Sequence, residues 1–364
     1  MRISVALPGE LGETELAAWR SIQRDDPALA NPFLSPEFTL AVGACRADAR
    51  VAVLFDGARP VGFFPHQRRP FGVGVPIGAG LSDCQGAVVE PGVHVDAGTL
   101  LRACRLSVWE FDHLAAGQKL FEGAVTATAP SPAIDVTAGY PALLERLRAS
   151  SPKFLRTTLA KERKLAARCG ELSFEYASGD RSTFHTLISW KSAQYRRTGR
   201  SDRFAHPWIV ELLERLHAVS GPDFAGRLSV LRAGGRVAAA HFGLASRHVL
   251  ACWFPTYDTE LARFSPGLVL HLRMAEAAAA EGLWHLDMGR GEMAYKESLK
   301  THDLTVAEGS LTRPTPVTAA HWLLRSPPRR LRAAVLADPR LRRAADRTLK
   351  GIGRLRTATR SAGH

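Results

Sequence analysis

The stretch DTELARFSPGLVLHLRMAEAAAAEGLWHLDMGRG, residues 258–291, places an alanine-rich segment between two glycine-containing corners. Ser265-Pro266-Gly267 opens the segment, and its composition predicts a helix over 268–281. Proline presets φ at a helix start and glycine removes the Cβ, so the backbone N–H groups of such a start can approach an anion closely. The pattern therefore predicts either a phosphate-binding helix start or an ordinary helix cap.

Alternating and helical patterns extend this unit on both sides. Residues 284–288, WHLDM, predict a strand, and the corner at 289–291 follows it. A short helix around Tyr295 and a closing strand over 304–311 complete the unit. The expected upstream order is a basic helix, a strand, two helices and three antiparallel strands, in the segments 152–168, 172–177, 182–199, 206–219, 228–244 and 248–258.

The first half of the sequence contains a weaker copy of the 228–244 hairpin. Residues 51–64, VAVLFDGARPVGFF, again predict strand, glycine turn and strand. Four pairs align at a constant offset of 177: Val53 and Val230, Leu54 and Leu231, Gly57 and Gly234, Arg59 and Arg236. A Pro-Gly corner at 90–92 precedes a helix-like stretch, as the 265–267 corner does. We therefore expect two copies of one α/β unit.

The net charge of +13 is concentrated at the end of the sequence. Residues 313–364 contain 13 Lys and Arg and 2 acidic residues, whereas the preceding 312 residues contain 35 basic and 33 acidic ones. Scattered leucines in this basic tail predict one weakly amphipathic helix. The plainer interpretation is a solvated extension. The alternative is contact with an anionic membrane surface or an acidic partner, in preference to nucleic acid.

Residue spacing favours neither a disulfide framework nor a metal centre. The five cysteines are scattered without a C-x-x-C pair, and the 13 histidines show no H-E-x-x-H spacing, so we predict no metal. The sequence has no run of the ~20 apolar residues that a membrane span needs. The apolar part of MRISVALPGELGE is too short for a signal peptide. We expect a cytoplasmic protein.

Several motifs together resemble one family of transferases. WKSAQYRRTG, FPTYDTELARFSPG and DMGRGEMAYK, with NPFLSPEFTLAV, VGFFPHQRR and LSDCQG in the first half, resemble the CelD/BcsL-type (BioF-like) acyltransferases. That family belongs to the Gcn5-related N-acetyltransferase (GNAT) superfamily and is linked to exopolysaccharide and cellulose systems. The resemblance covers roughly residues 30–312. Cys84 departs from the family pattern, which has an aromatic residue there, usually Tyr.

The resemblance implies an α/β (α+β) fold of tandem GNAT-like domains, each with a mixed, mainly antiparallel twisted sheet flanked by helices. We expect a degenerate N-terminal domain over residues 1–138, an acyltransferase domain over 139–312 and the basic tail over 313–364.

The resemblance also implies a donor site. In the GNAT fold the pyrophosphate of acyl-CoA lies on the corner before the helix, and the pantetheine arm runs beside the third strand, here 253–257. The donor would be acetyl-CoA or another acyl-CoA, used as a cosubstrate with no permanently bound cofactor. The expected donor-binding residues are Phe264, Ser265, Pro266, Gly267, Phe254 and Tyr257.

Attack of an acceptor amine or hydroxyl on the thioester needs a base and a proton donor for the leaving sulfur. The resemblance implies Tyr295 as the acid, and the candidate bases are Asp287, His241 and Glu292. A lone histidine on a strand, such as His241, is more often a core residue, and Asp287 is equally interpretable as a cap of the corner after it. The acceptor would be a small molecule or a saccharide. Its expected binding residues are Lys191, Gln194, Tyr195, Arg290 and Lys296.

Two other functions remain open from the sequence. A Fem-type aminoacyltransferase shares the doubled fold and takes its acyl group from charged tRNA, and the basic segment 152–168 would suit RNA. A GNAT fold without catalytic activity could instead serve as a binding module in polysaccharide assembly.

Overall fold

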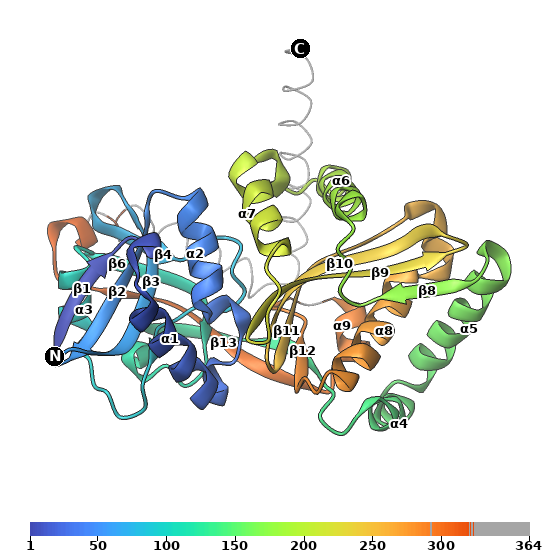
Figure 1. The fold of residues 1–364 in the computed structure, drawn as a ribbon, viewed down its shortest axis with the longest axis horizontal. Helices are drawn as coiled ribbons and strands as arrows, with labels where there is room; N and C mark the ends of the chain where they lie inside the picture. Colours follow the sequence, from blue (N-terminus) through green and yellow to red (C-terminus); the bar gives the residue numbers. More distant parts are fainter. Residues whose placement is uncertain (292, 320, 322, 324–364) are drawn as a thin grey trace, which may run out of the picture.

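The computed structural model describes residues 1–291, 293–319, 321 and 323. Figure 1 shows the first half (residues 1–138) and the second half (residues 139–312) side by side, joined through the middle of a sheet. The strands are β1 (Arg2–Ala6), β2 (Ala49–Asp56), β3 (Arg59–Arg69), β4 (Val73–Pro76), β5 (Val88–Val89), β6 (Val108–Ala115), β7 (Val125–Asp135), β8 (Leu172–Glu175), β9 (Phe224–Ala233), β10 (Arg236–Ser246), β11 (Val249–Tyr257), β12 (His285–Asp287) and β13 (His302–Thr312). The α-helices are α1 (Glu13–Asp25), α2 (Pro36–Cys45), α3 (Ala97–Ala103), α4 (Tyr140–Ser150), α5 (Pro152–Cys169), α6 (Arg181–Arg197), α7 (Pro207–His217), α8 (Pro266–Ala280) and α9 (Ala294–Leu299).

The order of elements repeats between the two halves. The first half runs β1-α1-α2-β2-β3-β4-α3-β6-β7, and the second runs β8-α6-α7-β9-β10-β11-α8-β12-β13. The short strand β5 interrupts the first copy, α9 follows β12 in the second, and α4 and α5 connect the two copies. The tandem, mainly antiparallel α/β fold expected from the sequence is therefore present.

The register of the two hairpins confirms their alignment. Asp56 pairs with Arg59 in the first hairpin, and Ala233 pairs with Arg236 in the second. Each hairpin also skips one residue in the ladder, Val61 in β3 and Ala238 in β10, and these bulged residues are again 177 positions apart. A bulge at the same place in both copies gives both sheets the same local bend.

The two halves exchange their last strands. The sheet runs β1-β2-β3-β4-β6-β13-β7-β12-β11-β10-β9-β8, with β5 paired to β3. Strand β13 of the second half pairs with β6 of the first, whereas β7 of the first half pairs with β12 of the second. Since β7 and β13 also pair with each other, neither half completes its sheet alone.

Helices cover both faces of this shared sheet. One face carries α1 and α2 of the first half and α6 and α7 of the second, whose buried side chains form one core across both halves. On the other face, α3 covers the first half, and α4, α5 and α8 cover the second. Figure 1 shows α2 beside α7 at the centre of the molecule, where these two helices pack on each other.

Some sequence expectations need adjustment. The corner at 90–92 does not start a helix, because α3 begins five residues later, at Ala97, with Asp96 as its N-cap. Helix α4 was not expected from the sequence. The basic tail lies outside the described residues except for 313–319, 321 and 323, and the candidate base Glu292 also lies outside them. No helix within the described residues is long and apolar enough to cross a membrane.

Candidate active site

A wedge opens in the sheet of the second half between β11 and β12. These parallel strands pair only from Val249 to Ala251 on β11 and from His285 to Asp287 on β12. Beyond Ala251, β11 continues to Tyr257 while paired with β10 alone. Its other edge therefore presents backbone N–H and C=O groups that an extended ligand with amide groups can bind.

Helix α8 starts beside the end of β11 and has no side-chain cap. Ser265 is its N-cap and lies in the left-handed region (φ 50°), and its hydroxyl does not bond the first turn. The hydroxyl instead accepts a hydrogen bond of 2.7 Å from Nζ of Lys161, which extends from α5. Tyr257 forms a wall here, with its Cδ1 3.6 Å from the place that a Cβ on Gly267 would occupy.

The corner therefore brings together three of the predicted donor residues and one residue that the sequence reasoning did not assign to it. Ser265, Gly267 and Tyr257 meet at the start of α8, and Lys161 adds a positive charge beside the Gly267 N–H, which has no acceptor within the described residues. Positive helix ends and a cation both attract phosphate. The basic character of the 152–168 segment was visible in the sequence, but its contact with Ser265 depends on how α5 packs against α8.

The other three predicted donor residues are buried in the packing around the wedge. Phe264 is 6% exposed and belongs to the core beneath α8. Phe254 is buried on the opposite face of the sheet, with its ring 5.2 Å from that of Phe204. Pro266 is buried at the first position of α8.

His241 supports the bend in β11. The register shift between β10 and β11 leaves Trp253 opposite no residue, and the Trp253 N–H donates to Nε2 of His241 at 3.1 Å. Full burial lowers the pKa of His241 well below its ordinary value, with the nearby His271 and Lys191 acting in the same direction. Since its accepting nitrogen is already engaged, the imidazole holds the bulge in place, which suits a structural role better than proton abstraction.

Tyr295 lies beneath α8, on the face of the sheet that carries His241. Its ring centroid is 5.5 Å from that of His271, whose Nδ1 bonds the Gly267 carbonyl at 2.6 Å. Burial, with a smaller effect of Cys252, raises the pKa of the Tyr295 phenol to about 12. The phenol is therefore protonated at neutral pH and can act as a proton donor.

Asp287 ends β12 and is held by three donors. Its Oδ1 accepts from the Ser131 hydroxyl at 2.7 Å and from the Gly289 N–H at 2.9 Å, and its Oδ2 accepts from Nδ2 of Asn31 at 3.1 Å. The carboxylate thus fixes the corner that follows β12. Two of its partners, Asn31 and Ser131, come from the first half of the chain.

Two lysines donate to backbone carbonyls in this region, and Lys296 is buried whereas Lys191 is half-buried. Lys296 of α9 is 7% exposed and donates to the Gly289 carbonyl at 2.8 Å. Lys191 of α6 donates to the Pro255 carbonyl of β11 at 2.8 Å. Burial lowers the pKa of Lys191 to about 8, and the positive charges of Arg200, Arg203 and Lys296 act in the same direction.

The other predicted acceptor residues have different surroundings. The Lys191 ammonium lies 5.7 Å from the ring centroid of Tyr195. The Oε1 of Gln194 is buried and has no hydrogen-bond partner within the described residues. Arg290 pairs with Glu308 of β13 at 2.9 Å and donates to the Asp112 carbonyl, so its guanidinium binds the first half and β13 instead of Asp287.

The first half supplies a wall of the site that sequence reasoning did not place there. In the LSDCQG segment, the Leu81 carbonyl accepts from the Trp253 indole N–H at 2.9 Å. Asp83 lies next to the Gly289 corner, with Oδ2 3.2 Å from the place of a Cβ on Gly289. Cys84, at the position that departs from the family pattern, is buried in the core shared by both halves. The motif was visible in the sequence, but no local pattern shows which strand end it meets.

The equivalent opening in the first half is closed. Strands β4 and β6 are paired only at Val73–Val108 and Gly74–Trp109. Gln85 then fills the space beside β6, where its N–H bonds the His113 carbonyl and its carbonyl accepts from the Ala115 N–H, both at 2.9 Å. Helix α3 is capped by its own Asp96, whose carboxylate accepts from the Thr99 N–H at 2.7 Å.

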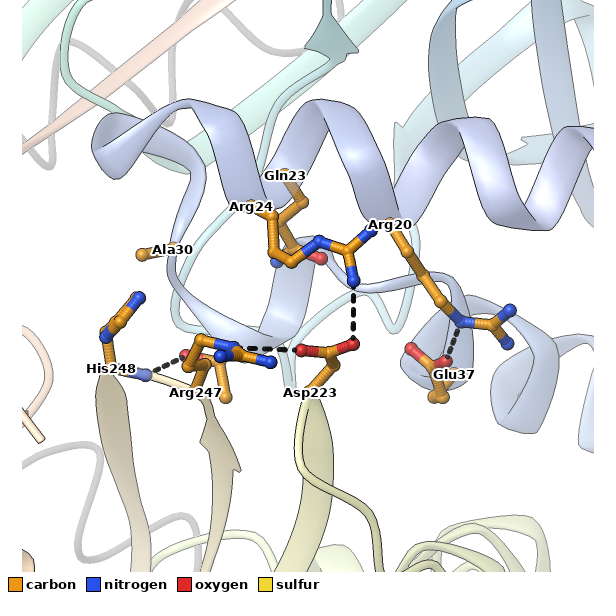
Figure 2. A pocket seen from close by; sticks show the side chains of 9 residues that line it. Arg20, Gln23, Arg24, Ala30, Glu37, Asp223, Arg247 and His248 are labelled. Atoms are coloured by element: carbon orange, nitrogen blue, oxygen red, sulfur yellow. Dashed lines mark hydrogen bonds and ion pairs between the residues drawn. The ribbon is translucent and has the colours of Figure 1, made fainter. Parts of the chain in front are cut away.

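A second cleft lies between the halves, at α1 and the ends of β9 and β10. Figure 2 shows Arg24 of α1 and Arg247 of the β10–β11 turn both directed at Asp223, at 3.5 and 3.2 Å. Arg20 pairs with Glu37 nearby at 2.7 Å. Each carboxylate in this cleft is paired with a guanidinium, and Asp223 is shared by Arg24 and Arg247, so the cleft links the two halves.

Residues 153–297, which include most of α5 and extend into α9, match a family model described as an acetyltransferase (GNAT) domain. The chain contains a GNAT acetyltransferase domain. This domain includes the wedge, the start of α8 and the corner after β12. No curated protein sequence matches the chain.

Solved structures with the same fold extend the likeness over both halves. The structure of FemX superposes with a TM-score of 0.58 at 10% identity, covering 85% of this chain and 96% of FemX. The C-terminal domain (DUF2156) of a proposed lysylphosphatidylglycerol synthetase from Agrobacterium fabrum superposes with a TM-score of 0.51 at 12% identity, covering 84% of this chain and 94% of that domain. At this identity the likeness shows the shared fold.

Proposed function

We propose that the protein is an acyl-CoA-dependent acyltransferase of the CelD/BcsL type. It would transfer an acetyl or other acyl group to a nitrogen or oxygen of a polar acceptor, such as a sugar or polysaccharide precursor. The observation that carries this proposal is the uncapped start of α8 beside an open strand edge, inside the part of the chain that matches the GNAT model.

The start of α8 supplies what a pyrophosphate needs. The Gly267 N–H has no acceptor within the described residues, and Lys161 brings an ammonium group to the Ser265 hydroxyl next to it. Gly267 has no Cβ to keep a phosphate away from the backbone. A diphosphate carries several acceptor oxygens and at least two charges, so it can use both the N–H and the ammonium.

The open edge of β11 suits the remainder of the donor. Pantetheine is an extended chain with two amide groups, and it can bind as a further strand at the edge of β11 that has no pairing strand over 252–257, where Lys191 already bonds the Pro255 carbonyl. The thioester would then lie toward the end of β12, where Tyr295 can protonate the leaving thiolate. The acceptor would enter between the two halves, on the side of Lys191, Tyr195 and Lys296 and away from the charged cleft at Asp223.

Isothermal titration of the full chain with acetyl-CoA tests this proposal. We expect saturable binding in the micromolar range, with free CoA retaining most of the affinity because the pyrophosphate is common to both. A folded sample that binds neither compound would contradict the proposal.

The exposed face of α5 favours a second candidate, a Fem-type transferase that uses aminoacyl-tRNA. Five basic side chains are exposed on this helix, more than a single CoA would contact at Lys161: Lys153, Arg156, Arg163, Lys164 and Arg168. A row of cations suits a polyanion such as RNA. A gel-shift with total tRNA distinguishes the two donors. The acyl-CoA proposal predicts either that tRNA causes no shift or that acetyl-CoA does not reverse the shift.

A further inference from the structure

Asp83 reaches the site of the second half from the first half of the chain. It belongs to the LSDCQG segment, and its carboxylate lies against the Gly289 corner after β12. Its charge acts on Tyr195 of α6 and on Lys296 of α9, two of the residues expected to bind the acceptor. Asp83 therefore lies near residues that we propose bind the acceptor.

The carboxylate of Asp83 has no hydrogen bond or ion pair within the part of the chain that the structure describes. The neighbouring Asp287 differs, because three donors occupy its two oxygens. A carboxylate that is already held by three donors gains little from a proton, whereas an unbonded one can accept it. Of these two aspartates, Asp83 is the better suited to proton transfer.

The charges around Asp83 come from four elements. Asp287 of β12 repels its negative form, while Lys296 of α9, His113 of β6 and Arg203 of the 3₁₀ turn Arg203–Ala205 attract it. Burial is the largest influence, and together with Asp287 it raises the pKa of Asp83 to about 6. At neutral pH the group is ionised but close to its midpoint, as a general base requires.

The segment that carries Asp83 is rigidly held. Gln85, two residues later, bonds the backbone of β6 in both directions, and its side chain donates to Asp112 at 2.8 Å and accepts from two N–H groups of β6. The same contacts that close the opening of the first half thus aim Asp83 at the second half. A positioned base needs this support from its neighbours.

We propose that Asp83 is the general base of the reaction, an assignment that rests on the proposed acyl-transfer function. The Asp83 carboxylate takes the proton from the acceptor N–H or O–H as that nitrogen or oxygen bonds to the thioester carbonyl carbon. The C–S bond then breaks, and the departing thiolate takes the phenol proton of Tyr295. Water returns a proton to Tyr295 and removes one from Asp83, so the net products are the acylated acceptor and CoA.

The test compares the full-length wild type with Asp83→Asn and Asp83→Glu, and uses Asp56→Asn at the exposed end of the first hairpin as the matched control. Binding of acetyl-CoA is measured by isothermal titration. Release of CoA is measured with a thiol reagent, with water alone and with glucosamine as the probe acceptor, from about pH 5 to about pH 9.

We expect all variants to bind acetyl-CoA as the wild type does. Asp83→Asn should lose about 100-fold or more in CoA release, and Asp83→Glu should restore part of it. The wild-type rate should fall as pH drops below about 6, and this fall should be absent from the residual rate of Asp83→Asn.

Equal CoA release by wild type and Asp83→Asn, at any rate including zero, would overturn the assignment while leaving the donor site intact. Loss of acetyl-CoA binding in the wild type is a different failure. It would remove the proposed function itself and, with it, the role of Asp83.

Discussion

The two halves of the molecule share one order of elements, but only the second half combines a helix start without a side-chain cap and a strand edge without a pairing strand. In the first half, Asp96 caps the start of α3 and Gln85 fills the space beside β6. In the second half, Ser265 leaves the start of α8 uncapped, and β11 keeps an unpaired edge from 252 to 257. We therefore propose that the second half binds the donor where its backbone groups lack internal partners, at a cost in stability that the rest of the fold offsets.

The closed half still takes part in the site. Asn31 and Ser131 hold Asp287, Leu81 accepts from Trp253, and Asp83 lies at the Gly289 corner. The exchange of β7 and β13 ties the halves together at this point. A degenerate first copy can therefore persist as the wall of the second copy's site instead of as a binding unit of its own.

The largest effect on stability is expected where the first half holds the second. Asp287→Ala leaves the donors of Asn31, Ser131 and Gly289 without their shared acceptor in a buried place. We expect the free energy of unfolding to fall by about 3 kcal/mol or more, measured by urea denaturation. A loss below about 1 kcal/mol would show that water replaces the carboxylate and that the contact between the halves is loose.

The start of α8 can be compared directly with the first half through two lysines. Lys161→Met removes the ammonium beside Ser265, and we expect the affinity for acetyl-CoA to fall about tenfold to a hundredfold. Lys119 begins the 3₁₀ turn Lys119–Ala124 after β6 and lines the hollow that precedes α3. Lys119→Met should leave the affinity unchanged. The affinities are measured by isothermal titration. An equal loss of affinity in Lys161→Met and Lys119→Met would mean that the lysine charges attract acetyl-CoA only at long range.

The sequence and the structure agree best where patterns are local. The hairpins, their 177-residue offset, α5 to α9 and the corner at 265–267 follow from periodicity, turn residues and helix-start residues. The exchange of β7 and β13, the contact of Lys161 with Ser265 and the approach of Asp83 to Gly289 do not. These contacts join segments 104 or more residues apart, and only the packing of the whole sheet determines them.

The two aspartates at the junction should respond oppositely to substitution. The folded-state pKa of Asp83, about 6, lies above its ordinary value of 3.8, so the folded state binds this proton more tightly than the unfolded state does. Stability is therefore lost as pH rises from about 4 through about 6. We expect Asp83→Asn to raise the free energy of unfolding by about 1–3 kcal/mol at about pH 7.5 and to have little effect below about pH 4.

Thermal or urea denaturation at these two pH values measures the effect. An equal rise in the free energy of unfolding at about pH 7.5 and below about pH 4 would indicate that the amide packs better than the carboxylate. A lower free energy of unfolding for Asp83→Asn at about pH 7.5 would show that the ionised carboxylate has a stabilising partner. Asp83 would then have a structural role like that of Asp287.

The smallest effect is expected at the charged cleft shown in Figure 2. Arg24, Asp223 and Arg247 are partly exposed, with side-chain exposures of 46%, 28% and 51%. Because water screens such pairs, Arg24→Ala should cost about 0.5 kcal/mol in the free energy of unfolding and leave acetyl-CoA binding unchanged. A loss of several kcal/mol would mean that this cleft, and not the exchanged strands, holds the halves together.

A tryptophan at the second position of α8, compared with one at the second position of α3, tests whether the donor binds at the start of α8. Among the described residues, a Cβ on Gly267 meets only Tyr257, at 3.6 Å, and a Cβ on Gly98 of α3 comes closest to the exposed Asp96 side chain, at 3.3 Å. Both chains should therefore fold. Isothermal titration with acetyl-CoA should show binding abolished in Gly267→Trp and retained in Gly98→Trp. Unchanged binding in Gly267→Trp, or its loss in Gly98→Trp, would contradict a donor site at the start of α8.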